Sequence, residues 1–319
     1  MDLVLGLDGG GTKTALALAD RDGRILERQI GAPQDPMAEP DWPAALERLL
    51  RSAEAYFPQV GAAVIGLPFH GEIADISAQQ SRVVQAILPM RHIVENDVRA
   101  AFDGAFAGRA GVLILAGTGS MAWAGDQQGR EHRIGGWGEA FGDEGSAYWI
   151  GREALSEASR ACDGRTTNKA FADALLNRLG LDQTELMAWC YGQEKRRASI
   201  AGLARMIDEL AEAGDAVARG LLQRAGDHLA EHAEAGWAWI GDKDQRRWSY
   251  AGGVLASRIV RDRIIERLGQ QPEEPRLPPV GGALLRAAQL CGWAVDDLWI
   301  GRLGQALAAP VSPETFVKN

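Results

Sequence analysis

The glycine-rich stretch GLDGGGTKTALALADRDGR at residues 6–24 limits most strongly what this chain can fold into. Its spacing is close to the P-loop pattern G-x-x-x-x-G-K-[ST]. However, Thr12 separates Gly11 from Lys13, so the lysine does not follow the last glycine as a P-loop requires. Only about five residues separate this turn from the Asp-Gly turn that follows, which is normal for a strand and too short for a core helix. The stretch therefore predicts a β-hairpin with polar residues at its tip.

A second stretch with the same pattern, GVLILAGTGSMAWAGDQQGR, occupies residues 111–130. A shift of 106 residues aligns Gly11 with Gly117 and Asp20 with Asp126. Both copies have a strand, a Gly-Thr turn, a second strand and a turn of the form Asp-x-x-Gly-Arg. Because such a recurrence is typical of duplicated units, we expect two domains of similar topology, each beginning with this hairpin. The expected domains are residues 1–109 and 110–319.

Hydrophobic periodicity predicts further strands and helices along the chain. In the first domain we expect strands at 3–8, 14–19, 24–30, 62–67 and 92–95, and helices at 43–57, 77–88 and 97–106. In the second domain we expect mostly helices after residue 144, one of them at 215–239, with a strand at 250–255, a helix from Ser257 and a loop at 270–279. The last twenty residues have only a weak pattern.

The composition is typical of a globular protein and argues against nucleic-acid and membrane partners. Of 319 residues, 46% are hydrophobic and 24% charged, the formal net charge is −9, and the longest basic run is Lys195-Arg196-Arg197. No apolar run approaches membrane length, and the start of the chain lacks the basic region of a signal peptide. Three scattered cysteines give no disulfide framework. We therefore expect a cytoplasmic protein.

The two glycine-rich turns together predict phosphate binding. Glycine allows backbone N–H groups to approach phosphate oxygens closely, and Thr12 and Thr118 add hydroxyl donors. Asp8, at the end of the first predicted strand, could hold Mg²⁺ through water, because Mg²⁺ keeps several waters and few carboxylates. Either turn alone is equally typical of an ordinary hairpin. The pair, with Asp8 in place, favours a phosphate clamp across a domain cleft.

Four motifs make the chain resemble a known group of enzymes. They are DGGGTKT at 8–14, END at 95–97, AGTGS at 116–120 and GGWGEAFGDEGSAYWIG at 135–151. The chain resembles the sugar kinase, Hsp70 and actin superfamily, and more closely its N-acetylglucosamine kinase branch, grouped with the BadF/BadG/BcrA/BcrD ATPases. The longest motif is the most specific of the four.

This resemblance implies a fold, a reaction and cofactors. The fold is α/β, with two ribonuclease-H-like (actin-like ATPase) domains around a cleft, the second helix-rich, and the final helical tail packing back on the first. The reaction is ATP- and Mg²⁺-dependent phosphorylation of a small-molecule sugar, N-acetylglucosamine, at its 6-hydroxyl, with glucosamine as the alternative acceptor. The family also implies a homodimer.

The resemblance implies roles for individual residues where the motifs match. Asp97 is the general base that takes the proton of the sugar's 6-hydroxyl, and Asp8 is the Mg²⁺ residue. The implied nucleotide contacts are Asp8, Gly10, Gly11, Thr12, Lys13, Thr118, Gly253 and Ser257. The implied sugar contacts are Gln34, Asn96, Asp97, Gly136, Trp137, Gly138 and Asp143.

Several of these residues also have a purely structural interpretation. Either Asn96 or Asp97 could be the N-cap of the helix that begins there, and Asp143 could cap a helix starting directly after it. Trp137 could pack in a core, and Gly252-Gly253 could form a plain turn from a strand to a helix.

Two loops depart from the family pattern. After the third strand, where amino-sugar kinases of the family often have an asparagine, this chain has GAPQDP, with Gln34 nearest. The loop after the next strand, usually small and rich in Ser and Gly, is GLPFHGE at 66–72. Both loops would flank the sugar's 2-substituent, so the resemblance predicts kinase chemistry more firmly than it predicts the sugar.

Other classes of site fit less of the sequence. HLAEH at 228–232 matches the H-x-x-E-H zinc pattern, but no third ligand can be named. ATPases that activate an acyl-CoA reductase or dehydratase share this fold and carry an iron–sulfur cluster, yet Cys162 and Cys190 lie in helix-like stretches without a glycine-flanked ligand loop. A sugar-binding regulator without catalysis is disfavoured because Asp8 and Asp97 are both present.

Overall fold

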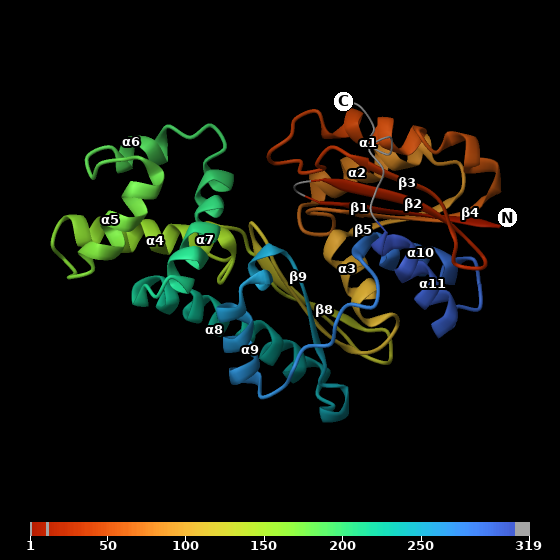
Figure 1. Ribbon diagram of the computed structural model, residues 1–319. Coiled ribbons are helices and arrows are strands. Elements are labelled where there is room, and N and C mark those ends of the chain that lie inside the picture. The colour runs from red at the N-terminus through yellow and green to blue at the C-terminus, as the bar shows by residue number, and fades with distance from the viewer. Residues whose placement is uncertain (1, 11–12, 310–319) are drawn as a thin grey trace. The chain divides into compact units, whose positions relative to one another are not determined.

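The computed structural model describes residues 2–10 and 13–309 (Figure 1). The chain divides into two compact units, Met1–Arg109 together with Glu274–Asn319, and Ala110–Glu273. The first unit includes helices α10 (Pro279–Leu290) and α11 (Asp297–Ala308). Helix α11 corrects the prediction of a weakly patterned end, because Trp299, Ile300, Leu303 and Leu307 form a buried stripe on it.

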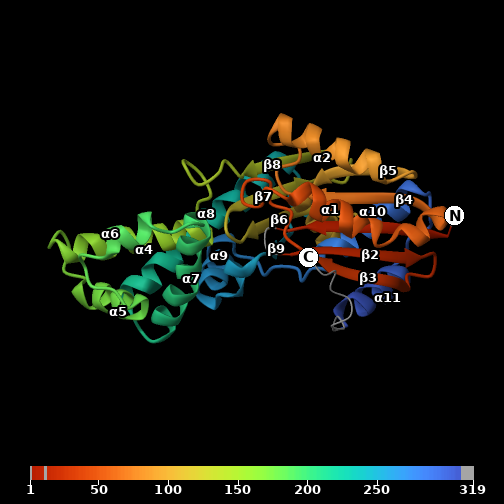
Figure 2. The ribbon, with the colours of Figure 1, turned by 90° about the horizontal axis from the view of Figure 1, so that it is seen from above.

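The first unit is built on a five-stranded sheet of order β3-β2-β1-β4-β5. The strands are β1 (Leu3–Gly9), β2 (Thr14–Asp20), β3 (Ile25–Gly31), β4 (Val60–Leu67) and β5 (Arg91–Asn96). The hairpin strands pair antiparallel, whereas β4 and β5 join β1 in parallel. Figure 2 shows β3 and β5 at opposite edges. The predicted α/β fold is thereby confirmed.

Two layers of helices cover the two faces of this sheet. Leu5 and Leu7 of β1 pack in one core with α1 (Trp42–Arg51) and α2 (Ala74–Ile87), while Val4 packs on the other face with α10 and α11 (Figure 1). This alternation follows from the period of two in a strand. Four helical segments of this unit come before α10 in the chain. They are α1 (Trp42–Arg51), the 3₁₀ helix η1 (Glu54–Gln59), α2 (Ala74–Ile87) and α3 (Asp97–Phe106).

The single helix predicted at 43–57 is wrong in its length. Helix α1 ends at Arg51, and the segment up to Gln59 is a separate 3₁₀ turn. The Ser52 hydroxyl donates to the Leu49 carbonyl at 2.5 Å, so the side chain bonds the backbone where the α-helix stops. By contrast, the helix predicted at 97–106 is confirmed.

The second unit contains a four-stranded sheet of order β8-β7-β6-β9, the same arrangement with one strand fewer. Its strands are β6 (Gly111–Ala116), β7 (Ser120–Gly125), β8 (Glu131–Gly135) and β9 (Trp248–Ala251). Its helical segments are α4 (Ala147–Cys162), α5 (Lys169–Leu179), α6 (Leu186–Tyr191), α7 (Arg196–Glu212), α8 (Ala216–Ile240), η2 (Lys243–Gln245), η3 (Gly253–Ala256) and α9 (Arg258–Leu268). Among the described residues, no helix combines the length and apolar character needed to span a membrane.

The strand predicted at 250–255 is displaced in the structure. Strand β9 begins at Trp248 and stops at Ala251. Gly252 then has φ 98°, a backbone conformation outside the range of a strand, and a short 3₁₀ helix follows. The strand is therefore shorter than its hydrophobic pattern suggests.

The two hairpins repeat one another in atomic detail. Asp20 Oδ1 accepts from the backbone N–H groups of Asp22 and Arg24, both at 2.9 Å. Asp126 Oδ1 accepts from the equivalent groups of Gln128 and Arg130, also both at 2.9 Å. The glycine of each turn has positive φ, 78° in the first copy and 75° in the second. The repeated Asp-x-x-Gly-Arg pattern thus encodes the same Asx turn twice.

Helices α3 and α10 approach so closely that only glycine fits between them. A Cβ atom on Gly282 would lie 2.0 Å from the Ala100 carbonyl oxygen and 2.4 Å from the Gly104 backbone nitrogen. This contact fixes α10 directly against α3, the helix that begins at Asp97.

We predict that Gly282→Ala destabilises the protein, because the added methyl group must displace helix backbone. Overpacking of this kind typically costs about 1–3 kcal/mol. The matched control is Gly301→Ala in α11, where nothing lies within 4 Å of the added Cβ. Exposed helical Gly→Ala changes typically stabilise by about 0.5–1 kcal/mol. Thermal unfolding should show a lower midpoint for the first variant, and equal midpoints would contradict the packing argument.

Candidate functional site

In the first unit, parallel pairing brings the carboxyl ends of three strands to one edge of the sheet. Asp8 of β1 pairs with Gly66 of β4, and Gly66 pairs with Glu95 of β5. Asp97 follows two residues after Glu95, at the first position of α3. A Cβ on Gly66 would lie 3.3 Å from the Asp97 Cα, so glycine permits this helix start to sit against β4. Ligands of open α/β sheets bind at this edge.

The helix start holds the Asp97 carboxylate in place. Asn96 is the N-cap of α3, and its Oδ1 accepts from the Val98 N–H at 3.0 Å. The same N–H also donates to Asp97 Oδ1 at 2.9 Å. The capping alternative is thus correct for Asn96, and it leaves the second oxygen of Asp97 for another partner.

The side chain of Asn96 is fully engaged by its neighbours. Its Nδ2 donates to the His70 carbonyl at 3.0 Å and to Glu72 Oε1 at 2.7 Å. An amide nitrogen has two donors, so both are used within the protein. Asn96 therefore fixes the 66–72 loop against the helix that carries Asp97, and it has no spare N–H for a sugar.

The loop itself is held by a network of polar contacts. His70 Nδ1 lies 3.0 Å from Gln80 Oε1, and Gln80 Nε2 donates to the Pro68 carbonyl at 2.8 Å. The Gly71 N–H donates to Ser77 Oγ at 2.9 Å. These bonds anchor the segment on α2, so Glu72 is presented from a fixed loop.

Two carboxylates at this edge, Asp8 and Glu72, raise the pKa of a third, Asp97. Burial raises the pKa of Asp8 to about 7, and the positive charge of Lys13 opposes that rise. Burial is also the main reason that the pKa of Asp97 rises to about 8, and the negative charges of Asp8 and Glu72 raise it further. The hydrogen bond from Val98 acts in the opposite direction. A proton acceptor with a pKa near neutrality suits general base catalysis.

The first glycine-rich turn is described in part. The Gly10 N–H donates to the Lys13 carbonyl at 3.0 Å, and Lys13 is exposed. The predicted contacts Gly11 and Thr12 lie outside the described residues. Gln34, a predicted sugar contact, is fully buried behind the turn, and its Nε2 donates to the Ala32 carbonyl at 3.3 Å. Among the described residues its Oε1 has no hydrogen-bond partner.

In the second unit, the Gly117–Gly119 turn abuts the start of α4. The carbonyls of Gly117 and Thr118 accept from the N–H groups of Ala147 and Tyr148, at 2.9 and 3.2 Å. Apart from its chain neighbours, no atom of the described residues lies within 4 Å of the position that a Cβ on Gly117 would take. The turn is thus fixed by its carbonyls while space remains beside its backbone.

The GDEGS segment is tied to the same turn. Ser120 donates its backbone N–H to Asp143 Oδ1 at 3.3 Å and its hydroxyl to the Glu144 carbonyl at 2.7 Å. Helix α4 starts at Ala147 with Ser146 as its N-cap, so the prediction that Asp143 caps a helix beginning at the next residue is wrong. Asp143 instead has φ 56°, and its carboxylate accepts from the Ser120 N–H and from Arg197.

The GGWG segment places an aromatic ring at the surface. Trp137 is 63% exposed, which excludes the core-packing alternative. Gly136 and Gly138 have φ 70° and 82°, and a Cβ on Gly136 would lie 2.5 Å from Met121 Cε. The glycines are therefore required by backbone shape. The Arg133 guanidinium lies 5.0 Å from the Trp137 ring centroid, a cation–π distance.

The turn before α9 lies against the end of β6. A Cβ on Gly252 would be 2.3 Å from the Ala116 carbonyl oxygen. Around a Cβ on Gly253, by contrast, the part of the chain that the structure describes places no atom within 4 Å beyond the neighbouring residues. Ser257 is the N-cap of α9, and its hydroxyl donates to Asp208 Oδ1 at 2.5 Å. The predicted nucleotide turn is thus next to the second glycine-rich turn in this unit.

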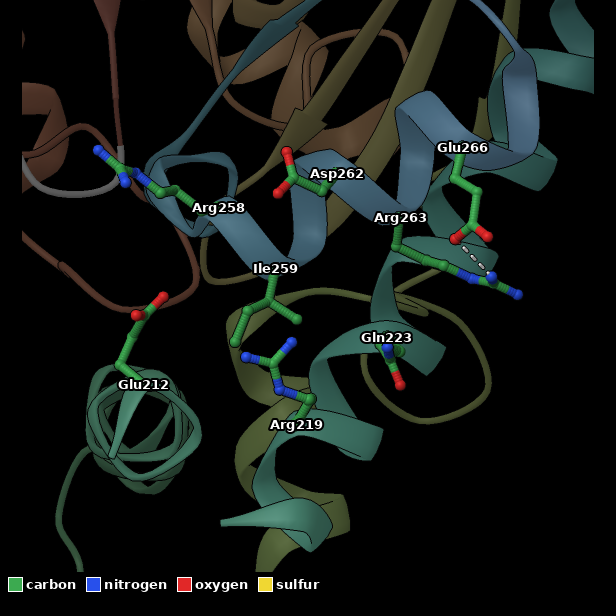
Figure 3. Close-up of a pocket in the computed structure, with 8 residues that line it drawn as sticks. All are labelled: Glu212, Arg219, Gln223, Arg258, Ile259, Asp262, Arg263 and Glu266. Atoms are coloured by element: carbon green, nitrogen blue, oxygen red, sulfur yellow. Dashed lines mark hydrogen bonds and ion pairs between the residues drawn. The ribbon is translucent and has the colours of Figure 1, made fainter. Parts of the chain in front are cut away.

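A cavity of about 240 Å³ lies among α7, α8 and α9 (Figure 3). Its lining is dominated by charged side chains of both signs, and Arg263 pairs with Glu266 at 2.8 Å. The lining residues are Glu212, Arg219, Gln223, Arg258, Ile259, Asp262, Arg263 and Glu266. None of the predicted site residues is among them, and small-molecule pockets are usually larger, about 300–1,000 Å³, and more apolar. The candidate site therefore rests on the turns and the strand ends.

The residues present fit the cofactors implied by the sequence. Mg²⁺ is held by one or two carboxylates plus waters. Burial raises the pKa values of Asp8 and Asp97, and the charges of Asp8 and Glu72 raise that of Asp97 further. A divalent cation bound beside these carboxylates would favour their ionised forms. For a nucleotide, the open space beside Gly117 and Gly253 leaves backbone groups accessible to phosphate.

Sequence reasoning missed one charged residue that the structure places at the predicted site. Arg197 contacts Asp143 at 2.7 Å and Glu139 at 3.2 Å. Its signal was the basic run at 195–197, but a charge run does not reveal which member turns inward. Of the H-x-x-E-H histidines, His232 is buried with Nδ1 2.8 Å from the His228 carbonyl, so that ring is used in helix packing.

Comparison with known proteins gives a consistent result. Residues 5–287 match the sequence profile described as the BadF/BadG/BcrA/BcrD ATPase family. The chain is 28% identical over 236 residues to the N-acetylmuramic acid/N-acetylglucosamine kinase of Clostridium acetobutylicum. The matched region covers 72% of this chain and 77% of that protein. It is 24% identical over 310 residues to the N-acetyl-D-glucosamine kinase of Dictyostelium discoideum, with coverage of 89% and 97%.

A solved structure extends the similarity to the fold. The crystal structure of a candidate N-acetylglucosamine kinase from Chromobacterium violaceum matches with a TM-score of 0.73 and 27% identity, covering 90% of this chain and 99% of that one. The fold class implied by the family resemblance is therefore confirmed.

We predict that Asp97→Asn gains stability relative to the unchanged protein as the pH rises. A carboxylate whose folded-state pKa is raised to about 8 stabilises the fold only while protonated, so its contribution is lost as pH rises from 3.8 through about 8. Thermal unfolding at about pH 5.5 and about pH 9 should show the difference between variant and parent growing with pH. The exposed Asp41→Asn change is the control, and a pH-independent difference would contradict the assignment.

Proposed function

We propose, from the premise that the chain belongs to the BadF/BadG/BcrA/BcrD ATPase family, that it is an ATP-dependent kinase of an amino sugar. The proposed acceptor is N-acetylglucosamine, and the product is N-acetylglucosamine 6-phosphate. Support comes from the kinases named above, which are similar over most of this chain, and from the chemistry of the strand-end carboxylates.

One observation carries the proposal: Asp97 stands at a helix start beside a second carboxylate at a strand end. In the proposed reaction Asp97 accepts the proton of the 6-hydroxyl while that oxygen bonds to the γ-phosphorus and ADP departs. The positive end of the α3 dipole stabilises the ionised form of Asp97, which the base needs before it can act. Asn96 keeps the neighbouring loop in place and thereby orients this base.

The other residues are proposed to bind and align. Bound Mg²⁺-ATP supplies the phosphoryl group, with Asp8 toward the metal and Gly10, Lys13 and Thr118 toward the phosphates. Gly253 and Ser257 lie at the proposed nucleotide turn. Phosphoryl transfer depends mainly on such alignment and charge neutralisation.

Gly136, Trp137, Gly138 and Asp143 are proposed to contact the sugar. An exposed indole can pack on a pyranose face, and a carboxylate can accept from two hydroxyls. We further propose a cytoplasmic location, where ATP is available, and a homodimer, for which the family resemblance is the basis.

Glucosamine is the second candidate acceptor, and Glu72 favours it. The Glu72 carboxylate is held by Asn96 at 2.7 Å and acts electrostatically on Asp97. With Asp8 and Asp97, Glu72 brings three carboxyl groups to this edge, and a nearby cation would favour their ionised forms. A free 2-ammonium group would form an ion pair there, whereas an acetamide carries no charge and could offer only a single N–H.

We predict that the protein releases ADP from Mg²⁺-ATP only when the correct amino sugar is present. The panel contains N-acetylglucosamine, glucosamine, N-acetylmannosamine, glucose and no sugar. Asp97→Asn should still bind the sugar but lose roughly 10²–10⁴-fold in turnover, because the base is removed. Near-normal turnover in that variant would remove Asp97 as the base, and sugar-independent ADP release would point to an ATPase that activates a partner.

We predict that Glu72→Gln separates the two acceptors. The amide can still accept the Asn96 hydrogen bond, so the change removes charge with little change in shape. If glucosamine is the acceptor, its kcat/KM should fall about tenfold or more, since hydrogen bonds to charged groups are worth about 1.5–3 kcal/mol. If N-acetylglucosamine is the acceptor, its kcat/KM should change by less than about threefold, because a neutral acetamide gains little from the charge. The ratio of the two kcat/KM values is the measurement.

A further inference from the structure

We propose that Arg197 is a positioning residue that fixes Asp143 for sugar binding. It also joins the loop that carries Asp143 to the second glycine-rich turn, Gly117–Gly119. This inference rests on the proposed function, because it gives Asp143 the role of a sugar contact. It concerns the second unit alone, where all the groups involved lie.

Both oxygens of Asp143 are held from defined directions. Arg197 Nη2 donates to Oδ2 at 2.7 Å, and the Ser120 N–H donates to Oδ1 at 3.3 Å. The Asp143 side chain is only 4% exposed, whereas that of Arg197 is 30% exposed. Two oxygens offer about four lone-pair directions, so two remain for sugar hydroxyls. A carboxylate held in this way is already oriented before the sugar binds.

The ion pair is pressed against the glycine-rich turn. A Cβ on Gly119 would lie 2.9 Å from Arg197 Nη2 and 2.9 Å from Asp143 Oδ2. Any side chain at this position would push the two charges apart. Gly119 directly follows Thr118, the proposed phosphate contact. The Arg197 guanidinium therefore sets the position of the Asp143 carboxylate, the proposed sugar contact, relative to the turn that carries Thr118.

A second carboxylate on the same loop faces Arg197. Glu139 Oε2 lies 3.2 Å from Arg197 Nε, and its side chain is 43% exposed. Glu139 and Asp143 flank the segment that carries Phe141. One arginine thus bridges two points of the loop, which restrains the short segment 140–142 between them.

Helix α7 carries Arg197 near its first residue and Asp208 near its last. Asp208 accepts from the Ser257 hydroxyl at 2.5 Å, at the turn proposed to hold the nucleotide. At 1.5 Å per residue the two side chains are separated by about 16 Å of rigid helix. A Cβ on Gly151 would lie 2.0 Å from the Ile200 carbonyl oxygen, so α4 fixes this helix by close backbone contact.

The test compares Arg197→Met with Arg197→Lys and with Arg196→Met as the matched control. Arg196 is the adjacent arginine, exposed and placed over the Tyr191 ring at 5.6 Å. We expect Arg197→Met to raise the sugar KM about tenfold or more, with a smaller effect on kcat. The KM for ATP should stay unchanged, because Asp208 still holds Ser257. Lysine keeps the charge but not the fork geometry, so it should restore sugar binding in part.

A double-mutant cycle separates positioning from a general structural role. If Arg197 acts through Asp143, Arg197→Met should add no more than about twofold to the sugar KM of Asp143→Asn. Additive effects, or a sugar KM equal to that of Arg196→Met, would overturn the inference. So would a parallel rise in the ATP KM, which would indicate displacement of α7.

Thermal unfolding of each variant identifies loss of folding. Should Arg197→Met not fold, Arg197→Lys in the same cycle decides the question, because it retains the charge. An unchanged protein that phosphorylates no sugar in the panel overturns the proposed function, and this inference falls with it. An active protein with an unaffected Arg197→Met variant overturns this inference alone.

Discussion

Parallel pairing of β1, β4 and β5 is the constraint on which the first unit's chemistry depends. It brings Asp8, the 66–72 loop and the Asn96-Asp97 pair to one edge, although they are far apart in sequence. The register leaves Asp8 and Glu72 close enough to Asp97 to raise its pKa further than burial alone does. Such an arrangement is unfavourable by itself, and it becomes useful when a proton, a metal ion or a cationic substrate is present to offset the repulsion.

Backbone-to-backbone contacts at glycine support this edge from behind. Gly66 allows the start of α3 to approach β4, and Gly282 allows α10 to lie directly on α3. Because α10 comes from the C-terminal part of the chain, the position of the proposed base depends on residues almost two hundred positions away. A base located by such close contacts has little freedom to shift, as catalysis by alignment requires.

The two units share a topology but use it differently. In the first, the strand ends carry carboxylates; in the second, the equivalent edge carries glycine turns and the Asp143–Arg197 ion pair. The repeated Asx turns at Asp20 and Asp126 lie in both copies with the same hydrogen bonds. The Asx turns therefore recur in both units, while the side chains at the proposed sites differ.

The sequence pattern predicted some elements closely and others not. Strands with alternating or continuous apolar residues and the helix at 97–106 were predictable because local periodicity determines them. The start of α4 was misplaced, because two neighbouring residues, Asp143 and Ser146, are both good caps. The choice between them depends on Ser120 and Arg197, which are distant in sequence.

The sequence by itself determined the hairpins, the repeat and the residue types of the candidate site, since these follow from local turn chemistry and motif spacing. Tertiary structure decided which polar groups are already used. In the folded chain both side-chain N–H groups of Asn96 are hydrogen-bonded, and Arg197 forms an ion pair with Asp143. The side chain of Gln34 is buried, and that of Trp137 is exposed. Hydrogen-bond saturation and burial arise from contacts between distant segments, and no local pattern encodes them.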